Sequence, residues 1–288
     1  MTVSPADLEK YIDTLLNANA FHDYCPNGLQ VDGGQDIHRI VTGVTACEAL
    51  IEAAIVYQAQ AILVHHGYFW KGEPAVLTGM KGTRIRKLMQ HGISLLAYHL
   101  PLDAHPTLGN NAQLAHVLGL TLSAPLYPEE KNPVGNIAIL DTPLSANALY
   151  QRLSRALQRE PLYIQGNQPF VQNAPPDNNH YHKIGICTGG AQDMLEQAHS
   201  QGCDVFISGE ISERTTHIAR ELGIDYFAAG HHATEKGGIR ALGEALSQGL
   251  TPSMLNKSLI MTNHLTRPLG NDGNFKLEIK FVDIPNPV

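Results

Sequence analysis

The sequence contains little cysteine and no long apolar run. Its four cysteines, Cys25, Cys47, Cys187 and Cys203, are scattered without a CxxC pair, which disfavours both a disulfide framework and a closed structural zinc site. No apolar stretch approaches the roughly 20 residues that a membrane-spanning helix needs. The first residues, MTVSPADLEK, lack the charged-then-apolar pattern of a signal peptide. We therefore expect a cytoplasmic protein without a membrane segment.

Charge is also sparse. Charged residues make up 16% of the 288 residues, and the formal net charge is −7, so broad electrostatic binding to nucleic acid is not indicated. A hydrophobic content of 43% is ordinary for a folded chain, and the length suits one large domain or two moderate ones. The unusual count is histidine, with fifteen residues, several of them in tight clusters. These clusters are the main candidates for function.

Two parts of the chain resemble each other. The segments that can be aligned are 40–67 with 183–210, and 85–101 with 216–232. Thr45 then falls over Thr188 and Gly92 over Gly223, and each copy reads as strands alternating with helices. We expect an α/β protein made of two related units, a diverged duplication with parallel sheets. The alternative is a chance similarity between two α/β units.

The first unit is expected at 1–125 and the second at 126–288, with the C-terminal segment packing back on the first unit. Thr45 and Glu48 have the spacing of a capping box, which predicts a helix start there. In the second unit, strands are expected at "NIAIL" and "PLYIQG", with a helix at "SANALYQRLSRALQ" and a polar loop at "NAPPDNNHYH". The stretch 249–276 reads as mostly loop, and "FKLEIKFVDI" alternates like a strand.

Histidines stand where the expected strands end. The apolar run in "AILVHHGYFWKGEP", residues 61–74, ends in His65 and His66. A second strand leads to His99, and a third leads to His231 and His232. Because ligands gather outside the carboxyl ends of parallel strands, we expect a functional site at these ends.

Carboxylates accompany two of these clusters. Asp103 follows His99 by four residues, past Pro101, in what reads as a loop. Glu235 follows His231 by four residues, which places both near one side of a first helical turn if a helix begins there. Either motif alone is more often structural, and Glu235 would also favour the helix dipole.

Taken together, the clusters predict a metal site. Mixed nitrogen and oxygen donors suit zinc, iron, manganese, cobalt or nickel better than calcium. Neighbouring residues of a regular strand point to opposite faces, so His65 and His66 would each hold one ion of a pair, and Glu235 is the candidate bridge. The expected ligands are His65, His66, Asp103, His231 and Glu235. A buried network of paired histidines and acids, without metal, is the alternative.

Several motifs together resemble the NIF-three-like family, the GTP cyclohydrolase I type 2 homologues, and in particular its bacterial YbgI-type members. The motifs are "PNGLQV", "IVTGVTA", "VHHGYFWKGE", "HLPLDAHP", "SGEISE", "GHHATEKGGIRAL" and "FVDIPNP". The resemblance implies two α/β units that flank a dinuclear metal centre, with the family's ligands at the five residues named above. It also implies a ring-shaped hexamer. It is weak over 128–180 and 249–276, whose roles stay open.

The resulting hypothesis is a hydrolase that depends on two divalent metal ions, which activate water for attack on an electrophilic carbon or phosphorus. The family name implies GTP and opening of its purine ring, for which His99 or His232 would act as general acid by position. Phosphoester hydrolysis is equally open to such a site. The rival class is an oligomeric adaptor in which the ions stabilise the assembly without catalysis.

The loop after His66 is the candidate binding surface for a small-molecule substrate. It contains Tyr68, Trp70 and Lys71, and Trp70 is the only tryptophan of the chain. A flat base would stack on the aromatic side chains, and Lys71 would meet a phosphate. Glycines at 67 and 72 would let the loop move. The alternative role for Trp70 is packing, within the chain or at a subunit contact.

Overall fold

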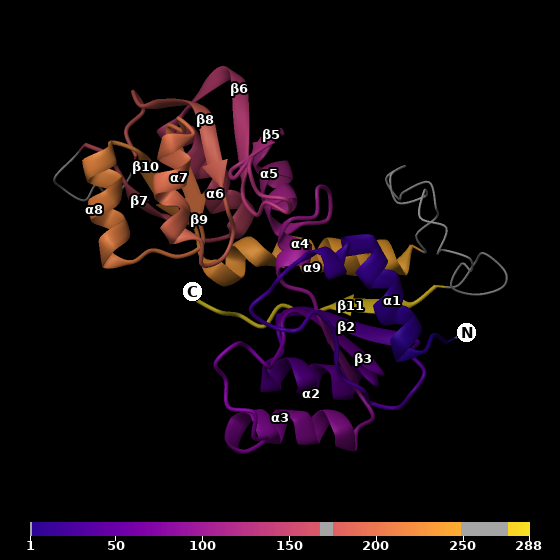
Figure 1. Ribbon diagram of the computed structural model, residues 1–288. Coiled ribbons are helices and arrows are strands. Elements are labelled where there is room, and N and C mark those ends of the chain that lie inside the picture. The colour runs from indigo at the N-terminus through magenta and orange to yellow at the C-terminus, as the bar shows by residue number, and fades with distance from the viewer. Residues whose placement is uncertain (1, 168–174, 249–275) are drawn as a thin grey trace. The chain divides into compact units, whose positions relative to one another are not determined.

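Figure 1 shows the computed structural model of the chain, which describes residues 2–167, 175–248 and 276–288. The chain divides into two compact units, each built on one sheet. The first unit comprises Met1–Leu102 and Ile239–Ile284, and the second comprises Asp103–Gly238 and Pro285–Val288. Over the ranges described, every helix is too short or too polar to cross a membrane.

The sheet of the first unit has the strand order β1-β4-β3-β2-β11. All neighbouring strands are parallel except β1, which pairs antiparallel with β4. The strands are β1 (Gly28–Val31), β2 (Arg39–Thr45), β3 (Ala61–His66), β4 (Ser94–Ala97) and β11 (Glu278–Phe281). The C-terminal strand β11 therefore forms an edge of this sheet, beside β2.

Helices cover both faces of this first sheet. Its helices are α1 (Pro5–Leu16), the short 3-10 turn η1 (Ala18–Ala20), α2 (Glu48–Tyr57) and α3 (Gly79–Gln90). Figure 1 shows α2 and α3 on one face and α1 on the other. Leu50 and Ile51 of α2 pack with Ile62 and Val64 of β3 in the buried core. The continuous apolar run of β3 is what a strand buried on both faces requires.

The sheet of the second unit has the order β5-β6-β8-β9-β10-β7. Its centre, β8-β9-β10, is parallel, whereas β5, β6 and β7 pair antiparallel. The strands are β5 (Leu122–Pro125), β6 (Asn136–Ser145), β7 (Leu162–Ile164), β8 (His180–Ile186), β9 (Val205–Ser208) and β10 (Asp225–Ala228). Both sheets are thus mixed, and the expectation of parallel sheets holds for β11, β2, β3 and β4 in the first unit and for β8, β9 and β10 in the second.

Two hydrophobic clusters lie in the second unit. One contains Leu149 and Leu153 of α6, and the other contains Leu195 and Ala219 from α7 and α8. The helices here are α5 (Asn110–Leu118), α6 (Ala146–Leu157), the 3-10 turn η2 (Gln192–Met194), α7 (Leu195–Ser200) and α8 (Glu213–Leu222). Two further helices cross the division between the units in sequence, α4 (Leu100–Asp103) and α9 (His231–Ser247).

The second unit begins at Asp103, earlier than the boundary expected after residue 125. The reason lies in residues 103–125. Strand β5 pairs with β6 of the second sheet, and Leu114 and Leu118 of α5 belong to the same cluster as Leu149. These apolar side chains are buried only as part of the second core.

The two units have the same arrangement of central strands, and in each unit one glycine packs closely against the backbone of another. In the first, β2, β3 and β4 lie in parallel beside antiparallel β1; in the second, β8, β9 and β10 lie in parallel beside antiparallel β7. A Cβ on Gly33 would lie 2.5 Å from the backbone of Gly92, and one on Gly166 would lie 2.4 Å from the backbone of Gly223. The predicted duplication is supported by this correspondence.

Several local predictions need correction. Helix α2 is capped by Cys47 without a side-chain hydrogen bond, so Thr45 is not the cap. Thr45 instead ends β2. The polar loop expected up to residue 182 ends earlier, because β8 begins at His180. The loop expected at 249–276 lies outside the described residues except for Lys276.

Candidate metal centre

The first unit gathers three imidazoles at the carboxyl ends of adjacent parallel strands. His65 and His66 end β3, and His99 follows β4. The ring of His65 lies 4.5 Å from that of His66 and 5.1 Å from that of His99, and the rings of His66 and His99 lie 5.8 Å apart. One ring nitrogen from each histidine lies within 4.8 Å of the others. The side chains that an ideal strand would separate therefore meet at the strand end.

Hydrogen bonds fix the tautomers of two of these rings. Nδ1 of His65 lies 2.9 Å from the carbonyl oxygen of Tyr98, and a carbonyl only accepts, so Nδ1 carries the hydrogen. Nδ1 of His99 lies 2.7 Å from Oδ1 of Asp23. In the neutral form, both rings then keep the lone pair on Nε2, the atom that binds metal. Nδ1 of His66 lies 3.3 Å from the Thr45 hydroxyl. Thr45, which the sequence predicted to cap a helix, therefore contacts a candidate ligand.

Asp23 was not anticipated from the sequence. Its side chain is 2% exposed and accepts hydrogen bonds from His99, from the Leu100 amide at 2.9 Å and from the Asn27 side chain at 3.0 Å. Burial by itself would raise the pKa of this carboxyl, but the hydrogen bonds and the charge of His99 lower it. Its signal in the sequence is faint, because Asp23 lies 76 positions before His99 in the chain.

Cys25 completes a group with Asp23 and His99 whose possible ligand atoms lie within 4.8 Å of one another. Burial, together with the charges of Asp23 and Glu73, raises the pKa of the Cys25 thiol to about 12. Since the thiolate is the form that binds metal, this cysteine is a weak ligand candidate. Cys25 is a free, buried thiol.

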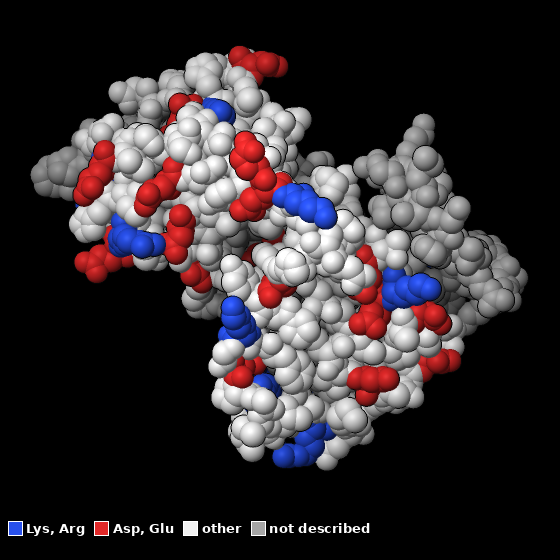
Figure 2. Space-filling view, viewed as in Figure 1, with Lys and Arg blue, Asp and Glu red and all other residues white. Residues whose placement is uncertain are grey.

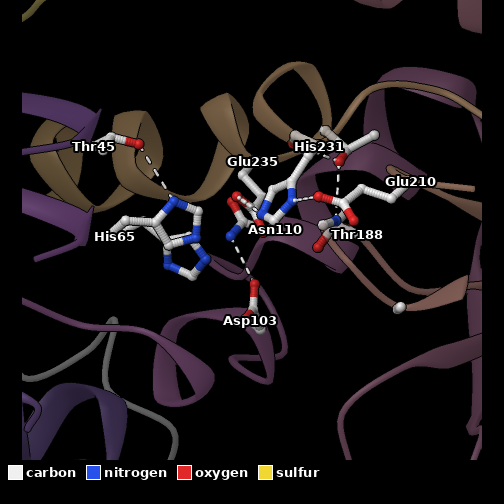
Figure 3. A network of polar contacts seen from close by, with 12 residues as sticks. Thr45, His65, Asp103, Asn110, Thr188, Glu210, His231 and Glu235 are labelled. Atoms are coloured by element: carbon white, nitrogen blue, oxygen red, sulfur yellow. Dashed lines mark hydrogen bonds and ion pairs between the residues drawn. The ribbon is translucent and has the colours of Figure 1, made fainter. Parts of the chain in front are cut away.

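The second unit presents an imidazole between two carboxylates (Figure 3). His231, at the start of α9, places Nδ1 2.7 Å from Oε1 of Glu210 and Nε2 3.2 Å from Oε2 of Glu235. Glu235 is buried, one helical turn after His231. The predicted spacing of four residues therefore does place both side chains on one side of the helix.

Asp103 is also held in the second unit. Its Oδ1 accepts a hydrogen bond of 2.7 Å from the Asn110 side chain. Oδ1 of Asn110 in turn accepts from the amide of Gly238 at 2.9 Å. Asn110 thereby links Asp103 to the helix that carries Glu235, and the two buried carboxylates belong to one ordered network within this unit.

The charge of this network favours a cation. Burial lowers the pKa of His231, but the hydrogen bonds and charges of Glu235 and Glu210 outweigh burial and raise it to about 9. Two carboxylates beside one imidazole thus stabilise positive charge. The same negative electrostatic potential would favour a divalent ion. Buried carboxylates with oriented imidazoles are the donors that zinc, iron, manganese, cobalt and nickel accept.

The five expected ligands thus fall into two groups, and both groups have donors suited to a divalent ion. His65 and His66 belong to the first unit, whereas Asp103, His231 and Glu235 belong to the second. Within each unit, every expected ligand lies next to another candidate donor or to a residue that orients it.

The residues expected to bind substrate differ in how far their side chains are exposed. Tyr68 is 4% exposed and donates a hydrogen bond of 2.7 Å to the Ala46 carbonyl. It packs in the first core, so its assignment to substrate binding is corrected. Trp70 is half-buried, with its ring 5.0 Å from that of His99, and Lys71 is exposed. His232 is largely buried, and its amide donates to the Val288 carbonyl at 3.0 Å.

The loop after His66 is braced by side chains. Gln30 accepts from the Tyr68 amide at 2.7 Å and donates to the Tyr68 carbonyl at 3.1 Å. A Cβ on Gly67 would lie 2.2 Å from the Gln30 side chain, so this glycine permits close packing. Phe69 has a φ of +65°, an uncommon value for a bulky residue, and its amide donates to Glu73 at 3.0 Å.

Comparison with known proteins shows extensive similarity. Residues 3–268 match the family model described as Duf34/NIF3 (NGG1p interacting factor 3). The chain is 47% identical to a protein of Vibrio cholerae and 46% identical to one of Yersinia pestis, each over 98% of both chains. Both relatives are named "GTP cyclohydrolase 1 type 2 homolog".

Solved structures agree with these matches. A structure described as "protein ybgI, unknown function" has a TM-score of 0.83 and 41% identity, covering 99% of this chain and 100% of that chain. TTHA1606 from Thermus thermophilus has a TM-score of 0.79 and 28% identity, with the same coverage. The mixed α/β fold with two sheets is therefore shared with proteins of similar length.

Proposed function

The chain belongs to the Duf34/NIF3 family, and from this premise we propose that it is a metal-dependent hydrolase with two divalent ions per chain. The ligands are His65, His66, Asp103, His231 and Glu235. The observation that carries the proposal is the orientation of the imidazoles. His65 and His231 each have Nδ1 against a carbonyl or carboxylate oxygen, the arrangement that metal-binding histidines almost always show.

Asp103 lies close in sequence to the first-unit histidines. The first-unit histidines and Asp103 are linked by α4, a single turn of helix that starts directly after His99 and ends at Asp103. His231 and Glu235 lie in the first turn and a half of α9. Glu235 would be the carboxylate that holds both ions, because a buried side chain with two oxygens can offer one to each ion.

Two bound ions of this kind supply Lewis acidity that activates water near neutral pH. Other residues of the chain orient the proposed ligands. Glu210 and the Tyr98 carbonyl orient His231 and His65, and Asn110 fixes Asp103. His99 and His232 were the expected general acids; His232 is largely buried, whereas the side chain of His99 is 15% exposed.

The proposed substrate is a nucleotide. The relatives carry GTP cyclohydrolase in their names, and Trp70 stands beside His66 and His99 with ring distances of 5.8 and 5.0 Å. A purine stacked on this indole would lie next to the histidine cluster, with Lys71 available for a phosphate. Water would then open the purine ring, or cleave a phosphoester.

A metal analysis with a product assay tests the proposal. Protein prepared without chelator or histidine tag should contain about two divalent ions per chain. Loaded protein should convert GTP into a product heavier by one water. Release of phosphate would redirect the proposal to phosphohydrolysis, and a metal content of zero would refute the site.

A second candidate function, a metal-binding adaptor in a homo-hexamer, is favoured by a separate observation. Val76, Leu77 and Met80 are exposed and close together in sequence, before and within the first turn of α3, and adjacent exposed apolar side chains mark interaction surfaces. Metal-loaded protein that turns over no nucleotide, amide or phosphoester but assembles through these residues would favour this function.

A further inference from the structure

Tyr24 is an exposed aromatic residue beside the histidines of the first unit, and the sequence did not single it out. It is 63% exposed, an unusual value for a large aromatic residue. Its ring lies 6.5 Å from that of His99. We propose that Tyr24 binds substrate, and that it forms with Trp70 a two-sided aromatic contact for a purine. This proposal rests on the proposed nucleotide substrate and deepens it.

The main chain around Tyr24 is held on both sides. The buried side chain of Asp23, the residue before it, accepts a hydrogen bond from His99 at 2.7 Å. Cys25, the residue after it, is buried, and the Tyr24 carbonyl accepts from the Lys71 amide at 2.6 Å. The exposure of the ring therefore does not come from a loose segment. Because its main chain is fixed before binding, the ring loses little conformational entropy when a ligand stacks on it.

The hydrogen bond to Lys71 also joins Tyr24 to the loop that carries Trp70, since Lys71 directly follows Trp70 in sequence. The ring of Trp70 contacts His99 as well, with 5.0 Å between the ring centres and 83° between the planes. Tyr24 meets the same imidazole with 65° between the planes. Two aromatic side chains from separate segments of the first unit therefore border one imidazole.

These side chains indicate the chemical class of the ligand. Two aromatic rings offer faces on which any base can stack, and the larger ring system of a purine gains more contact than a pyrimidine does. Lys71 is exposed next to them in sequence and offers positive charge to a phosphate. The group formed by Tyr24, Trp70 and Lys71 fits a purine nucleotide. It should therefore distinguish a nucleotide from a sugar phosphate that lacks the base.

The test compares two ligands that differ in the base, GTP and ribose 5-phosphate, on the full chain loaded with Zn²⁺. The fluorescence of Trp70 reports GTP binding after rapid mixing, and competition with GTP reports the binding of ribose 5-phosphate. Tyr24→Ala should weaken GTP binding about 10–100-fold and leave the affinity for ribose 5-phosphate unchanged. Tyr24→Phe keeps the ring and should retain most of the GTP affinity. Val56→Ala, at an exposed position of α2, is the control and should change neither affinity.

Two results would overturn the inference while the proposed function stands. One is a Tyr24→Ala variant that binds GTP as tightly as the unaltered chain. The other is a Tyr24→Ala variant that loses bound metal, or that loses affinity for GTP and for ribose 5-phosphate equally, since its role would then be structural. A metal-loaded unaltered chain that binds no nucleotide would instead refute the proposed substrate, and the inference with it. Elemental analysis and circular dichroism melts accompany each variant.

Discussion

Glu210 and His231 form a carboxylate–imidazole pair, with 2.7 Å between Oε1 of Glu210 and Nδ1 of His231. Glu210 follows β9, and His231 begins α9 shortly after β10, so neighbouring parallel strands bring together residues 21 positions apart. The main chain of Glu210 is also fixed, since its carbonyl accepts from the Tyr226 hydroxyl. Glu210 is therefore a positioning residue for a proposed ligand.

Replacing Glu210 should weaken metal binding without unfolding the chain. Glu210→Gln removes the charge that favours His231 as a donor, and loss of such an outer carboxylate typically costs 10–100-fold in metal affinity. The measurement is competition with a chromophoric chelator. Glu221→Gln, an exposed glutamate of α8, is the control. Equal affinity in both variants would refute the assignment.

A buried aspartate should dominate the stability of the second unit. Asp225 accepts hydrogen bonds from the Tyr163 hydroxyl at 2.7 Å, the Gly166 amide at 2.8 Å and the Asn179 side chain at 2.6 Å, and also from the Tyr181 hydroxyl. Asp225→Ala leaves these donors without their acceptor. Because hydrogen bonds to a charged group are lost, we expect the free energy of unfolding to fall by about 3 kcal/mol.

The matched comparison lies in the first unit. Ser94 begins β4 as Asp225 begins β10, and its hydroxyl accepts from the Gly33 amide at 3.0 Å. Ser94→Ala removes one neutral hydrogen bond and should cost about 1 kcal/mol. Urea unfolding measures both variants. A smaller loss for Asp225→Ala than for Ser94→Ala would contradict the prediction.

The same cluster predicts reduced stability at alkaline pH. Burial raises the pKa of Tyr181 and of Tyr163 above the ordinary value of 10.0, and the charge and hydrogen bond of Asp225 raise both further. The unfolded chain releases these protons near pH 10, whereas the folded chain keeps them. Stability is therefore complete below pH 10 and falls as the pH rises above it.

Urea midpoints measured from pH 8 to about pH 11 test this dependence. Tyr181→Phe should be less stable than the unaltered chain at pH 8, because it loses a buried hydrogen bond, but should lose less on going to high pH. Tyr24→Phe, at an exposed position, should follow the unaltered chain. Parallel pH curves for all three proteins would be incompatible with the prediction.

Trp70→Ala should weaken nucleotide binding by about 10–100-fold, because base–aromatic stacking is worth roughly 1–3 kcal/mol. Metal content and oligomeric state should not change. The single tryptophan gives the readout, since its fluorescence should respond to added nucleotide, and Trp70→Phe should retain most of the affinity. If nucleotide leaves the fluorescence unchanged, or if Trp70→Ala dissociates an oligomer, the indole packs and does not bind.

Much of the fold could be predicted from local patterns. Apolar runs of strand length identified β3 and β10, and α8 ends at Gly223, a glycine with a φ of +73°. These features depend on residues near one another in the chain. The antiparallel pairing of β1 with β4 and of β7 with β10 was not predicted, because an edge strand is defined by a partner that lies far away in sequence.

The sequence by itself also determined which residue types stand at the strand ends, including His65, His66 and His231, because parallel strands place their carboxyl ends at one edge. Only the tertiary structure decided how those side chains are held. Asp23 contacts His99 across 76 positions, and Thr45 meets His66 where its spacing had predicted a helix cap. Orientation of an imidazole depends on a single hydrogen bond to Nδ1, and that bond forms only after distant strands have packed.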